Sequence, residues 1–560
     1  MRAPEWRDWL SRGGARSYQA RFPADSNRII DAIEYGVPVD YTGDRTAGRS
    51  APNLPIDPGD VARVTAVIEA DARSGKKAGP FSERPFPNFC VSPIGAVPKK
   101  SGGLRVIHHL SFPHGGDSIN ASVMEEYLPL GSFAQAARAV RKLGVLCWLI
   151  KLDVEAAYKQ VPVRPEDWAL LGFCWQGKFY YERVLPFGLR SSCRLWELFA
   201  AVLHFLCQHV LGVTVAHIVV HYVDDFLFVI QFQEGVGPAA AQAMLDAALA
   251  LCAELGIPMA GAKTEGPVHR LTFLGLELDV DTQELVARLP ASRLKELELL
   301  MVEWQSKTRA SVQQLQSLCG LLNFACAVVR PGRFYLRRII AHTARIQAVQ
   351  REQGVSARQG HHAQWPLSAA VQEDVAWWQQ FLPHWNGVSL LYQLEWEQAE
   401  QLELFTDACN GGYGCLFRTH WMAGVWSAAE LRAAHRKKRM SMPFLELRAL
   451  VIAVATWGSQ WAGRKIVFRC DCMPVVLALA RGASLRADMM HQLRELAVVA
   501  YREGFDFRIE HIAGVANVAA DALSRDDMLQ FRAACPRAER QATPPVQVPL
   551  PPAAVPLEEM

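Results

Sequence analysis

Two adjacent aspartates interrupt an apolar run in HYVDDFLF, residues 221–228. Asp224 and Asp225 lie between β-branched and aromatic residues, which is typical of a hairpin with the acids at its tip. A third acid, Asp153, ends a similar run in LIKLDV. If these strands are neighbours, three carboxylates meet at one sheet edge, where burial and mutual repulsion call for cations. Oxygen ligands of this kind favour Mg²⁺ or Mn²⁺, whereas an ordinary surface turn is the alternative.

A second set of acids lies in the last third of the chain. In order, the acids come from a strand, a helix, the end of a later strand and the start of a last helix, and we expect them to meet at one edge of a sheet. Four converging acids indicate two divalent ions, with water as the nucleophile and a phosphodiester as the target. These acids are Asp407, Glu446, Asp471 and Asp521.

The elements that must position these acids follow from hydrophobic periodicity. Strand-like runs alternate with helical stretches at 192–209 and 238–255, which predicts an α+β arrangement. Residues 288–350 are mainly helical in pattern. From residue 401, strands and helices alternate again, and LELFTDACNGGYGCLF (402–417) is interpreted as a single strand.

Composition narrows the class of protein. The 560 residues are 50% hydrophobic and 21% charged, and the net charge of +3 does not by itself indicate a polyanion partner. Thirteen scattered cysteines without a CxxC pair indicate reduced thiols. No signal peptide or membrane-length apolar run is found, so we expect an intracellular protein, cytoplasmic or nuclear, with no membrane partner. The last 25 residues hold seven prolines, which predicts a disordered tail.

Around the first acids, the sequence resembles reverse transcriptases. KLDVEAAY and YVDD resemble their two catalytic motifs, LPFGLRSS their template and nucleotide loop, and FLGLEL their primer-gripping hairpin. The motifs occur in the family's order between residues 80 and 340. The resemblance implies a right-hand polymerase of fingers, palm and thumb with two Mg²⁺ (or Mn²⁺) per active site. Asp153, Asp224 and Asp225 would bind metal, with the Val154 carbonyl as a further ligand.

The same resemblance assigns residues to the incoming dNTP. Tyr158 matches the aromatic gate that excludes a ribose 2′-hydroxyl, although a core aromatic is the alternative. Arg105 matches the arginine that contacts the triphosphate, with Lys100 or Lys99 beside it. Phe187 stands where retroviral enzymes carry glutamine. Lys263 resembles the lysine that protonates pyrophosphate, and a solvated surface lysine is its alternative.

A later stretch, LQSLCGLLNFACAVVRPGRFYLRR, resembles the thumb helix that lies in the minor groove of primer and template. Gln316, Gly320 and Phe324 recur at i, i+4 and i+8 and share one helical face. A mid-helix glycine is understandable if a nucleic-acid backbone comes close, and helix packing against it is the alternative. Arg330 and Arg333 begin a basic cluster suited to phosphates, continued by Arg337 and Arg338.

The second set of acids resembles ribonuclease H. FTDACNGGYG, FLELRAL and HIAGVANVAADALSR match its first strand, its glutamate helix and its closing segment. His511 would be the mobile histidine that helps product release, with an ordinary loop histidine as the alternative. The basic run AHRKKRM (434–440) fits hybrid binding, nuclear import or a solvated loop equally well.

Together these patterns predict a multi-domain α+β chain: an N-terminal extension (1–75), fingers and palm (76–285), a thumb (286–345), a connection (346–400), an α/β ribonuclease H-like domain (401–528) and a disordered Pro-rich tail (529–560). The enzyme would use an RNA template and a DNA primer, and then degrade the RNA of the hybrid. VAWWQQFLPHWNG within 375–387 favours retrotransposons of the DIRS type, which encode a tyrosine recombinase. An RNA-dependent RNA polymerase and a silent, domesticated nucleic-acid-binding protein are the rival readings. The sequence indicates no oligomeric state.

Overall fold

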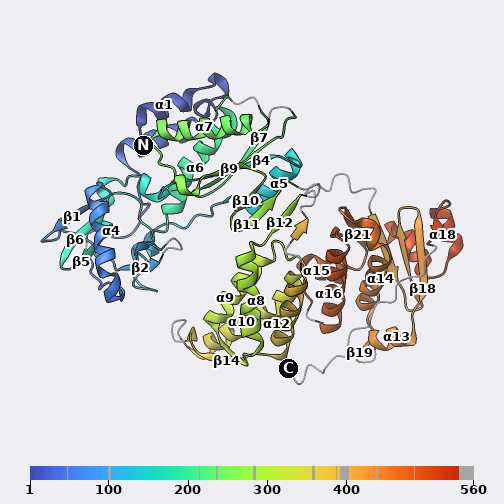
Figure 1. The fold of residues 1–560 in the computed structure, drawn as a ribbon. Coiled ribbons are helices and arrows are strands. Elements are labelled where there is room, and N and C mark those ends of the chain that lie inside the picture. The colour runs from blue at the N-terminus through green and yellow to red at the C-terminus, as the bar shows by residue number, and fades with distance from the viewer. Residues whose placement is uncertain are drawn as a thin grey trace. The chain divides into compact units, whose positions relative to one another are not determined.

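The computed structural model describes residues 1–541 except 47, 99–101, 213–214, 235–236, 282–284, 356–359, 386–387, 391–402, 437–438 and 485. It divides into two compact units (Figure 1): residues 1–274 with 280–283, and residues 275–279 with the chain from 284 onward. Both combine helices with sheets, which confirms the predicted α+β multi-domain class. The predicted extension thus joins the fingers and palm in one unit, and the predicted thumb, connection and last domain share the other.

A four-stranded sheet, in the order β7-β8-β4-β9, forms the centre of the first unit. β4 (Trp148–Asp153) and β7 (His217–Tyr222) both pair antiparallel with β8 (Asp225–Ile230), and β9 (Glu265–Val268) lies beside β4. Apolar side chains of the sheet pack in one core with two long helices. These are α6 (Ser192–His209) and α7 (Ala239–Leu255), close to their predicted bounds.

The fingers part of the first unit contains a three-stranded sheet and a separate hairpin. The sheet is β1 (Lys77–Phe81), β6 (Lys178–Glu182) and β5 (Gly172–Trp175), and the hairpin is β2 (Ile94–Pro98) with β3 (Leu104–His108). The end of β3 packs against the loop at 185–192, where the His108 amide donates to the Phe187 carbonyl at 3.0 Å. Gly188 there has φ +109°, and a Cβ on it would lie 2.0 Å from the His108 carbonyl oxygen, so this approach requires glycine.

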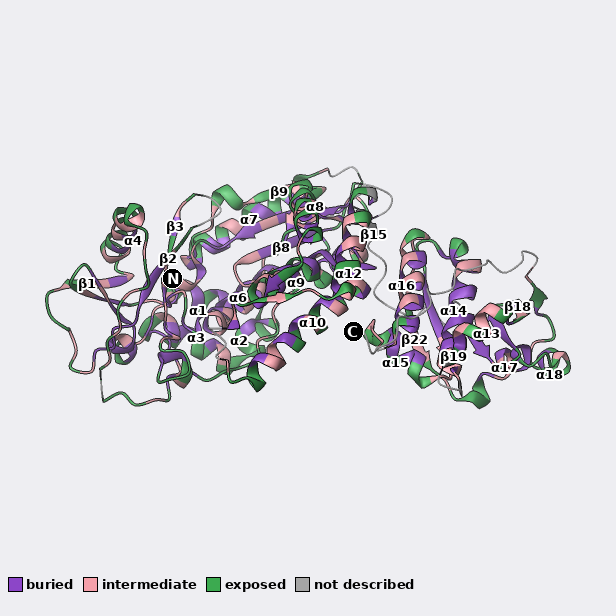
Figure 2. Cartoon of the chain, turned by 90° about the horizontal axis from the view of Figure 1, so that it is seen from below, coloured by how far each residue is buried: buried purple, intermediate pink, exposed green. Residues whose placement is uncertain are grey.

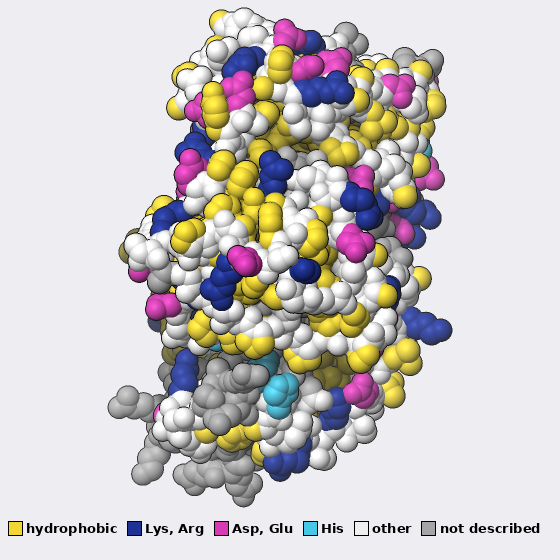
Figure 3. Space-filling model, turned by 90° about the vertical axis from the view of Figure 1, so that its left-hand side faces the viewer, with side chains coloured by type: hydrophobic (Ala, Val, Ile, Leu, Met, Phe, Trp, Pro, Cys, Tyr) yellow, Lys and Arg dark blue, Asp and Glu magenta, His cyan; other side chains and the backbone are white. Residues whose placement is uncertain are grey.

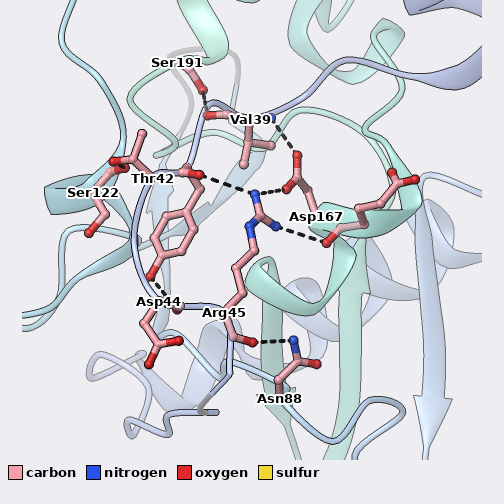
Figure 4. A network of polar contacts seen from close by, with 10 residues as sticks. Val39, Thr42, Asp44, Arg45, Asn88, Ser122, Asp167 and Ser191 are labelled. Atoms are coloured by element: carbon pink, nitrogen blue, oxygen red, sulfur yellow. Dashed lines mark hydrogen bonds and ion pairs between the residues drawn. The ribbon is translucent and has the colours of Figure 1, made fainter.

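The first 46 residues are built into this unit, although their weak periodicity gave no indication of it. Trp6 in α1 (Ala3–Ser11) is fully buried and donates to the Leu255 carbonyl at 3.0 Å. Figure 4 shows that the carboxylate of Asp167 accepts from the Val39 amide (2.8 Å) and pairs with Arg45 (2.7 Å). Since Asp167 is only 3% exposed, these contacts fix the segment firmly against the fingers.

Four helices begin the second unit: α8 (Ala291–Gln305), α9 (Val312–Ala325), α10 (Gly332–Glu352) and α12 (Ala369–Phe381). The predicted thumb–connection boundary at 345/346 falls inside α10 and is wrong as an element boundary. Asp374 of α12 is fully buried and accepts from Arg338 of α10 (2.9 Å) and from Arg494 of α16 (Ala487–Arg502) at 2.5 Å. Through this carboxylate the helices are tied to the C-terminal part of the same unit.

The C-terminal part is a mixed sheet in the order β22-β21-β16-β17-β18-β23. The stretch interpreted as one strand is two, β16 (Glu403–Ala408) and β17 (Gly412–Phe417), because the Asn-Gly-Gly at 410–412 turns the chain. β18 (His420–Val425) pairs with β17, and β21 (Lys465–Cys470) lies parallel between β16 and β22 (Asp506–His511).

Helices cover both faces of this sheet, and Figure 2 shows buried residues concentrated between helices and strands. α14 (Met442–Trp457), α15 (Met473–Arg481) and α16 contribute to the core on one face, and α17 (Val518–Ser524) to the core on the other. By length and composition alone, Met442–Trp461 could cross a membrane, but 72% of its apolar window is buried inside the unit. It is the central core helix of the C-terminal part.

The predicted start of the disordered tail at residue 529 is wrong. α18 (Met528–Ala534) buries Phe531 against Trp421, with ring centroids 5.3 Å apart, and β23 (Glu539–Arg540) pairs with β18. Phe531, an apolar residue within a charged segment, therefore packs against Trp421. Residues 542–560, which hold most of the prolines, lie outside the described residues.

Candidate active sites

Three aspartates lie together at one end of the central sheet of the first unit. Asp153 ends β4 directly opposite Asp225, the first residue of β8, and Asp224 lies in the turn between β7 and β8. The Val154 amide donates to the Asp224 carbonyl at 2.9 Å, which joins the two chain segments beside the acids. The expected convergence at one sheet edge is therefore observed. The binding of metal by these acids and by the Val154 carbonyl stays a prediction.

Burial and repulsion make this cluster electrostatically costly. Asp153 is 5% exposed. Burial, followed by the neighbouring acids, raises the pKa of Asp224 and raises that of Asp225 to about 6. Lys263 compensates in part, because its Nζ donates to Asp153 Oδ2 at 2.8 Å and its charge lowers the pKa of both neighbours. The cluster offers several hard oxygen donors, and such a set fits a divalent cation of the magnesium type.

The turn that carries Asp224 is held by residues with no motif of their own. Val223 has φ +57°, which is unusual for a β-branched residue, and the Nε1 of the fully buried Trp196 donates to its carbonyl at 2.8 Å. In the preceding strand, His221 Nε2 lies 2.8 Å from Glu197 Oε1. Trp196 and Glu197 both belong to α6, so this helix positions the turn.

Three predicted nucleotide-binding residues lie side by side. The guanidinium of Arg105 is 4.4 Å from the ring centroid of Phe187, and the Phe187 and Tyr158 rings are 5.3 Å apart. Burial raises the pKa of Tyr158, and a side-chain hydrogen bond to Cys193 raises it further. Arg105 also lowers the pKa of Asp224, so the row extends toward the acids. Lys263 is largely exposed apart from its contact with Asp153. Lys100 and Lys99 lie outside the described residues.

The predicted nucleic-acid face of α9 is open. Gln316, Gly320 and Phe324 are all exposed, and a Cβ on Gly320 would meet no atom within 4 Å. The alternative, that Gly320 allows a close helix contact, therefore lacks support among the described residues. At this surface, Gln316 Oε1 lies 3.0 Å from His361 Nε2 and is placed to accept a hydrogen bond from it.

The basic cluster after α9 is only partly available to phosphates. Arg330 pairs with Asp506 at 2.8 Å, and Arg338 is engaged by Asp374 and Glu373, whereas Arg333 and Arg337 are exposed. On the face of the molecule in Figure 3, Lys and Arg side chains alternate with Asp and Glu, in keeping with the small net charge. Arg333 and Arg337 are thus better placed for phosphates than Arg330.

Four acids form a second cluster at the C-terminal sheet. Asp407 lies in β16, Glu446 in α14, Asp471 just after β21 and Asp521 in α17. Asp407 feels the charges of Asp471 and Asp521, and Glu446 feels those of all three, so the four share one site. The four acids are therefore not scattered over different faces of the sheet.

The second cluster contains the larger pKa shift of the two. Glu446 is 6% exposed, and burial, followed by the charges of Asp407 and Asp471, raises its pKa to about 9. Burial also raises the pKa of Asp407 to about 6, although its Oδ2 accepts a hydrogen bond from Ser524. Oε2 of Glu446 is buried and has no hydrogen-bond partner. An orphaned carboxylate oxygen among other acids is a donor set that fits a cation.

A histidine and an arginine border the second cluster. His511, the last residue of β22, is exposed, and its Nε2 lies 3.2 Å from the Asp471 carbonyl oxygen. Arg525 Nε donates to Asp521 Oδ1 at 2.7 Å, a contact that was not predicted although Arg525 ends the motif HIAGVANVAADALSR. In the basic run at 434–440, β19 (His435–Arg436) and β20 (Arg439–Met440) form a short hairpin, and Lys437 and Lys438 lie outside the described residues.

Comparison with known sequences bears on the first site. Residues 97–278 match the family model of reverse transcriptase (RNA-dependent DNA polymerase), and the matched segment contains Asp153, Asp224 and Asp225. The chain is 28% identical to the transposon Tf2-3 polyprotein of Schizosaccharomyces pombe over 176 residues. This alignment covers 31% of this chain and 12% of that protein. It is 24% identical to Protein P of duck hepatitis B virus over 301 residues. This alignment covers 50% of this chain and 32% of that protein. The chain thus spans about an eighth to a third of these relatives.

Among solved structures, the chain is similar to a foamy viral protease-reverse transcriptase in complex with dsDNA. The TM-score is 0.48 at 14% identity, over 90% of this chain and 96% of that chain. A foamy viral protease-reverse transcriptase in complex with RNA/DNA hybrid gives a TM-score of 0.47 at 12% identity, over 99% of this chain and 66% of that chain.

Proposed function

We propose that this chain is an RNA-directed DNA polymerase that also cleaves the RNA strand of the RNA–DNA hybrid. The observation that carries the proposal is the meeting of Asp153, Asp224 and Asp225 at one sheet edge within a reverse transcriptase domain. The nuclease half of the proposal is supported by the second cluster of four acids and by the strand order of the sheet that holds it.

At the first site, two Mg²⁺ or Mn²⁺ ions would lower the pKa of a primer 3′-hydroxyl and neutralise charge on the leaving pyrophosphate. Asp153, Asp224 and Asp225 would hold these ions, with the Val154 carbonyl as a further ligand. Arg105 would bind the triphosphate of a dNTP, and the Tyr158 ring would exclude a 2′-hydroxyl by occupying its space. Lys263, already beside Asp153, is suited to donating a proton to pyrophosphate.

At the second site, Asp407, Glu446, Asp471 and Asp521 would hold a pair of the same ions, which would activate water against a phosphodiester. His511 is exposed at the rim, where it would help the cleaved RNA to leave. The hybrid itself would be gripped by the open face of α9 around Gly320 and by Arg333. A polymerase joined to such a nuclease copies RNA and removes the used template.

We further propose that the chain comes from a retrotransposon of the DIRS type, on the basis of VAWWQQFLPHWNG and of the VVRPGRFYLRR form of the thumb. Its partners would be an RNA template, a DNA primer and dNTPs, together with an element-encoded tyrosine recombinase. Such an enzyme would work inside the cell, in the cytoplasm, the nucleus or both.

The test is extension of a DNA primer on an RNA template, with cleavage of the same template followed in parallel. We expect incorporation of dNTPs in preference to rNTPs and shortening of the RNA, both dependent on Mg²⁺ or Mn²⁺. A preference for rNTPs would favour the RNA polymerase reading. Binding of hybrid with neither extension nor cleavage would favour a silent, domesticated protein.

A further inference from the structure

A thiol lies among the acids of the second site. Cys470 is the last residue of β21, and one ligand atom each from Cys470, Glu446 and Asp471 all lie within 4.8 Å of one another. Cys470 shares the core with Ile466 and Phe468 on the face of the sheet that packs against α14. Its Sγ therefore lies on the side from which α14 presents Glu446.

Two observations indicate that this trio is able to receive a ligand. Glu446 is 6% exposed, and its Oε2 has no hydrogen-bond partner among the residues that the structure describes. Cys470 is 1% exposed, and its Sγ accepts a hydrogen bond of 3.4 Å from the Cys472 amide. Asp471 is half-buried and opens the trio toward solvent. A buried carboxylate oxygen and a thiol are thus left facing a shared position.

Sulfur changes which cation such a position prefers. Mg²⁺ takes hard oxygen ligands, whereas Zn²⁺ and its relatives bind thiolate sulfur at about 2.3 Å and carboxylate oxygen at about 2.0–2.2 Å. Ligands at these lengths around a tetrahedral ion are separated by about 3.5 Å, so the trio, within 4.8 Å at present, contracts by up to about 1.3 Å on binding. We propose that Cys470, Glu446 and Asp471 form a binding site for one thiophilic divalent cation of the zinc class, with water as the fourth ligand.

Binding replaces the thiol proton with the metal. The S–H bond breaks, the proton leaves to solvent, and the sulfur donates its electron pair to the cation, so no oxidant or reductant is involved. Because Glu446 and Asp471 also belong to the four-acid cluster, the thiophilic ion displaces magnesium-type ions from it. One consequence rests on the proposed nuclease function: zinc-class ions inhibit RNA cleavage.

The experiment titrates Cd²⁺ into the metal-free full chain and records the ultraviolet charge-transfer absorption of cadmium–thiolate bonds. The wild type is compared with Cys470→Ser and with Cys252→Ser, a buried cysteine in the core of the first unit, as the matched control. We expect Cys470→Ser to lose one tightly bound equivalent of Cd²⁺ and Cys252→Ser to keep it. Identical titrations for all three proteins would overturn the proposal.

A second variant keeps the test decisive if Cys470→Ser does not fold. Asp471→Asn changes a half-buried residue and leaves the thiol in place. We expect it to lower the affinity for the same equivalent of Cd²⁺ at least tenfold. An unchanged affinity would overturn the proposal. The absorption band is independent of RNA cleavage, so its presence in a protein without nuclease activity would count against the proposed function alone. Where cleavage is found, Zn²⁺ should inhibit the wild type at lower concentration than Cys470→Ser.

Discussion

The two acid clusters of this chain solve the same electrostatic problem in different ways. In the first, Lys263 reaches Asp153 and offsets part of the negative charge, so the pKa of Asp225 rises only to about 6. In the second, Glu446 is deeply buried with an orphaned oxygen, and its pKa rises to about 9. A surface lysine thus offsets charge at the first site, whereas burial at the second favours protonated acids, whose protons a cation would have to displace.

The comparison is tested most severely by removing one acid from each cluster. Asp224→Asn should lower DNA synthesis on the order of 10³-fold or more while hybrid cleavage continues, and Asp471→Asn should do the reverse. The physical reason is that each change removes a proposed metal ligand from one site only. Primer extension and RNA cleavage are measured on the same primed template. Loss of both activities from either change would mean that the clusters are not separate sites.

Tyr158→Val tests whether the first site selects dNTPs over rNTPs by means of the Tyr158 ring. Removal of the ring opens the space for a 2′-hydroxyl, and we expect discrimination against rNTPs to fall about 10- to 100-fold. Steady-state incorporation of dNTP and rNTP gives the ratio. Tyr158→Phe is the control, because it keeps the ring and loses only the hydroxyl that contacts Cys193. An unchanged ratio in Tyr158→Val would remove the residue from the nucleotide pocket.

Glu446→Gln should flatten the pH dependence of the second site. A carboxyl whose pKa is raised in the folded protein contributes stability that is present below its ordinary value of 4.5 and is lost as pH rises through about 9. The metal-free wild type should therefore become less stable from pH 5 to 9, and its Mg²⁺ affinity should rise up to about tenfold per pH unit.

Thermal unfolding without metal, and calorimetry of Mg²⁺ binding in buffers of different ionisation enthalpy, measure these two effects. The control is Glu539→Gln, an exposed glutamate of β23. If Glu446→Gln keeps the full pH dependence of stability and the same proton release, another group is responsible for both.

Lys263→Met should make the first site resemble the second. Without the lysine charge, the pKa of Asp224 and Asp225 rises further, so protons compete with metal up to a higher pH. We expect Mg²⁺ affinity at pH 7 to fall several-fold, with little change at pH 9, where the acids are ionised in either protein. Lys263→Arg should restore most of the affinity. A fall that is equal at both pH values would show that Lys263 acts through structure instead.

Much of the architecture could be predicted because its signals are local. The apolar runs around Asp153 and Asp224 gave the strands, and the helix at 192–209 was predicted at its observed bounds. The hairpin at Cys409–Gly411 was missed because one apolar pattern runs through both of its strands, although Asn410 and Gly411 are turn residues. Phe531 was missed because a single apolar residue in a charged segment says nothing of its distant partner.

The parts of the sites that escaped prediction depend on contacts between distant segments. Trp196 is one apolar residue among many in its helix, and only the fold brings its indole to the Val223 carbonyl. Asp167 and Arg45 are separated by 121 intervening positions and neither lies in a motif, so their ion pair is visible only in three dimensions. Neither the depth of Glu446 nor the nearness of Cys470 follows from spacing, because both depend on how α14 lies on the sheet.

The carboxylate of Asp374 has a mechanical consequence. It accepts hydrogen bonds from both α10 and α16 and belongs to α12, so it links the helices beside α9 to the part of the unit that contains the four acids. On the proposed function, this link would hold the RNA cleavage site at a constant number of base pairs from the point where α9 binds the hybrid. Loss of the Asp374 contacts would then widen the distribution of RNA fragment lengths before it changed the rate of cleavage.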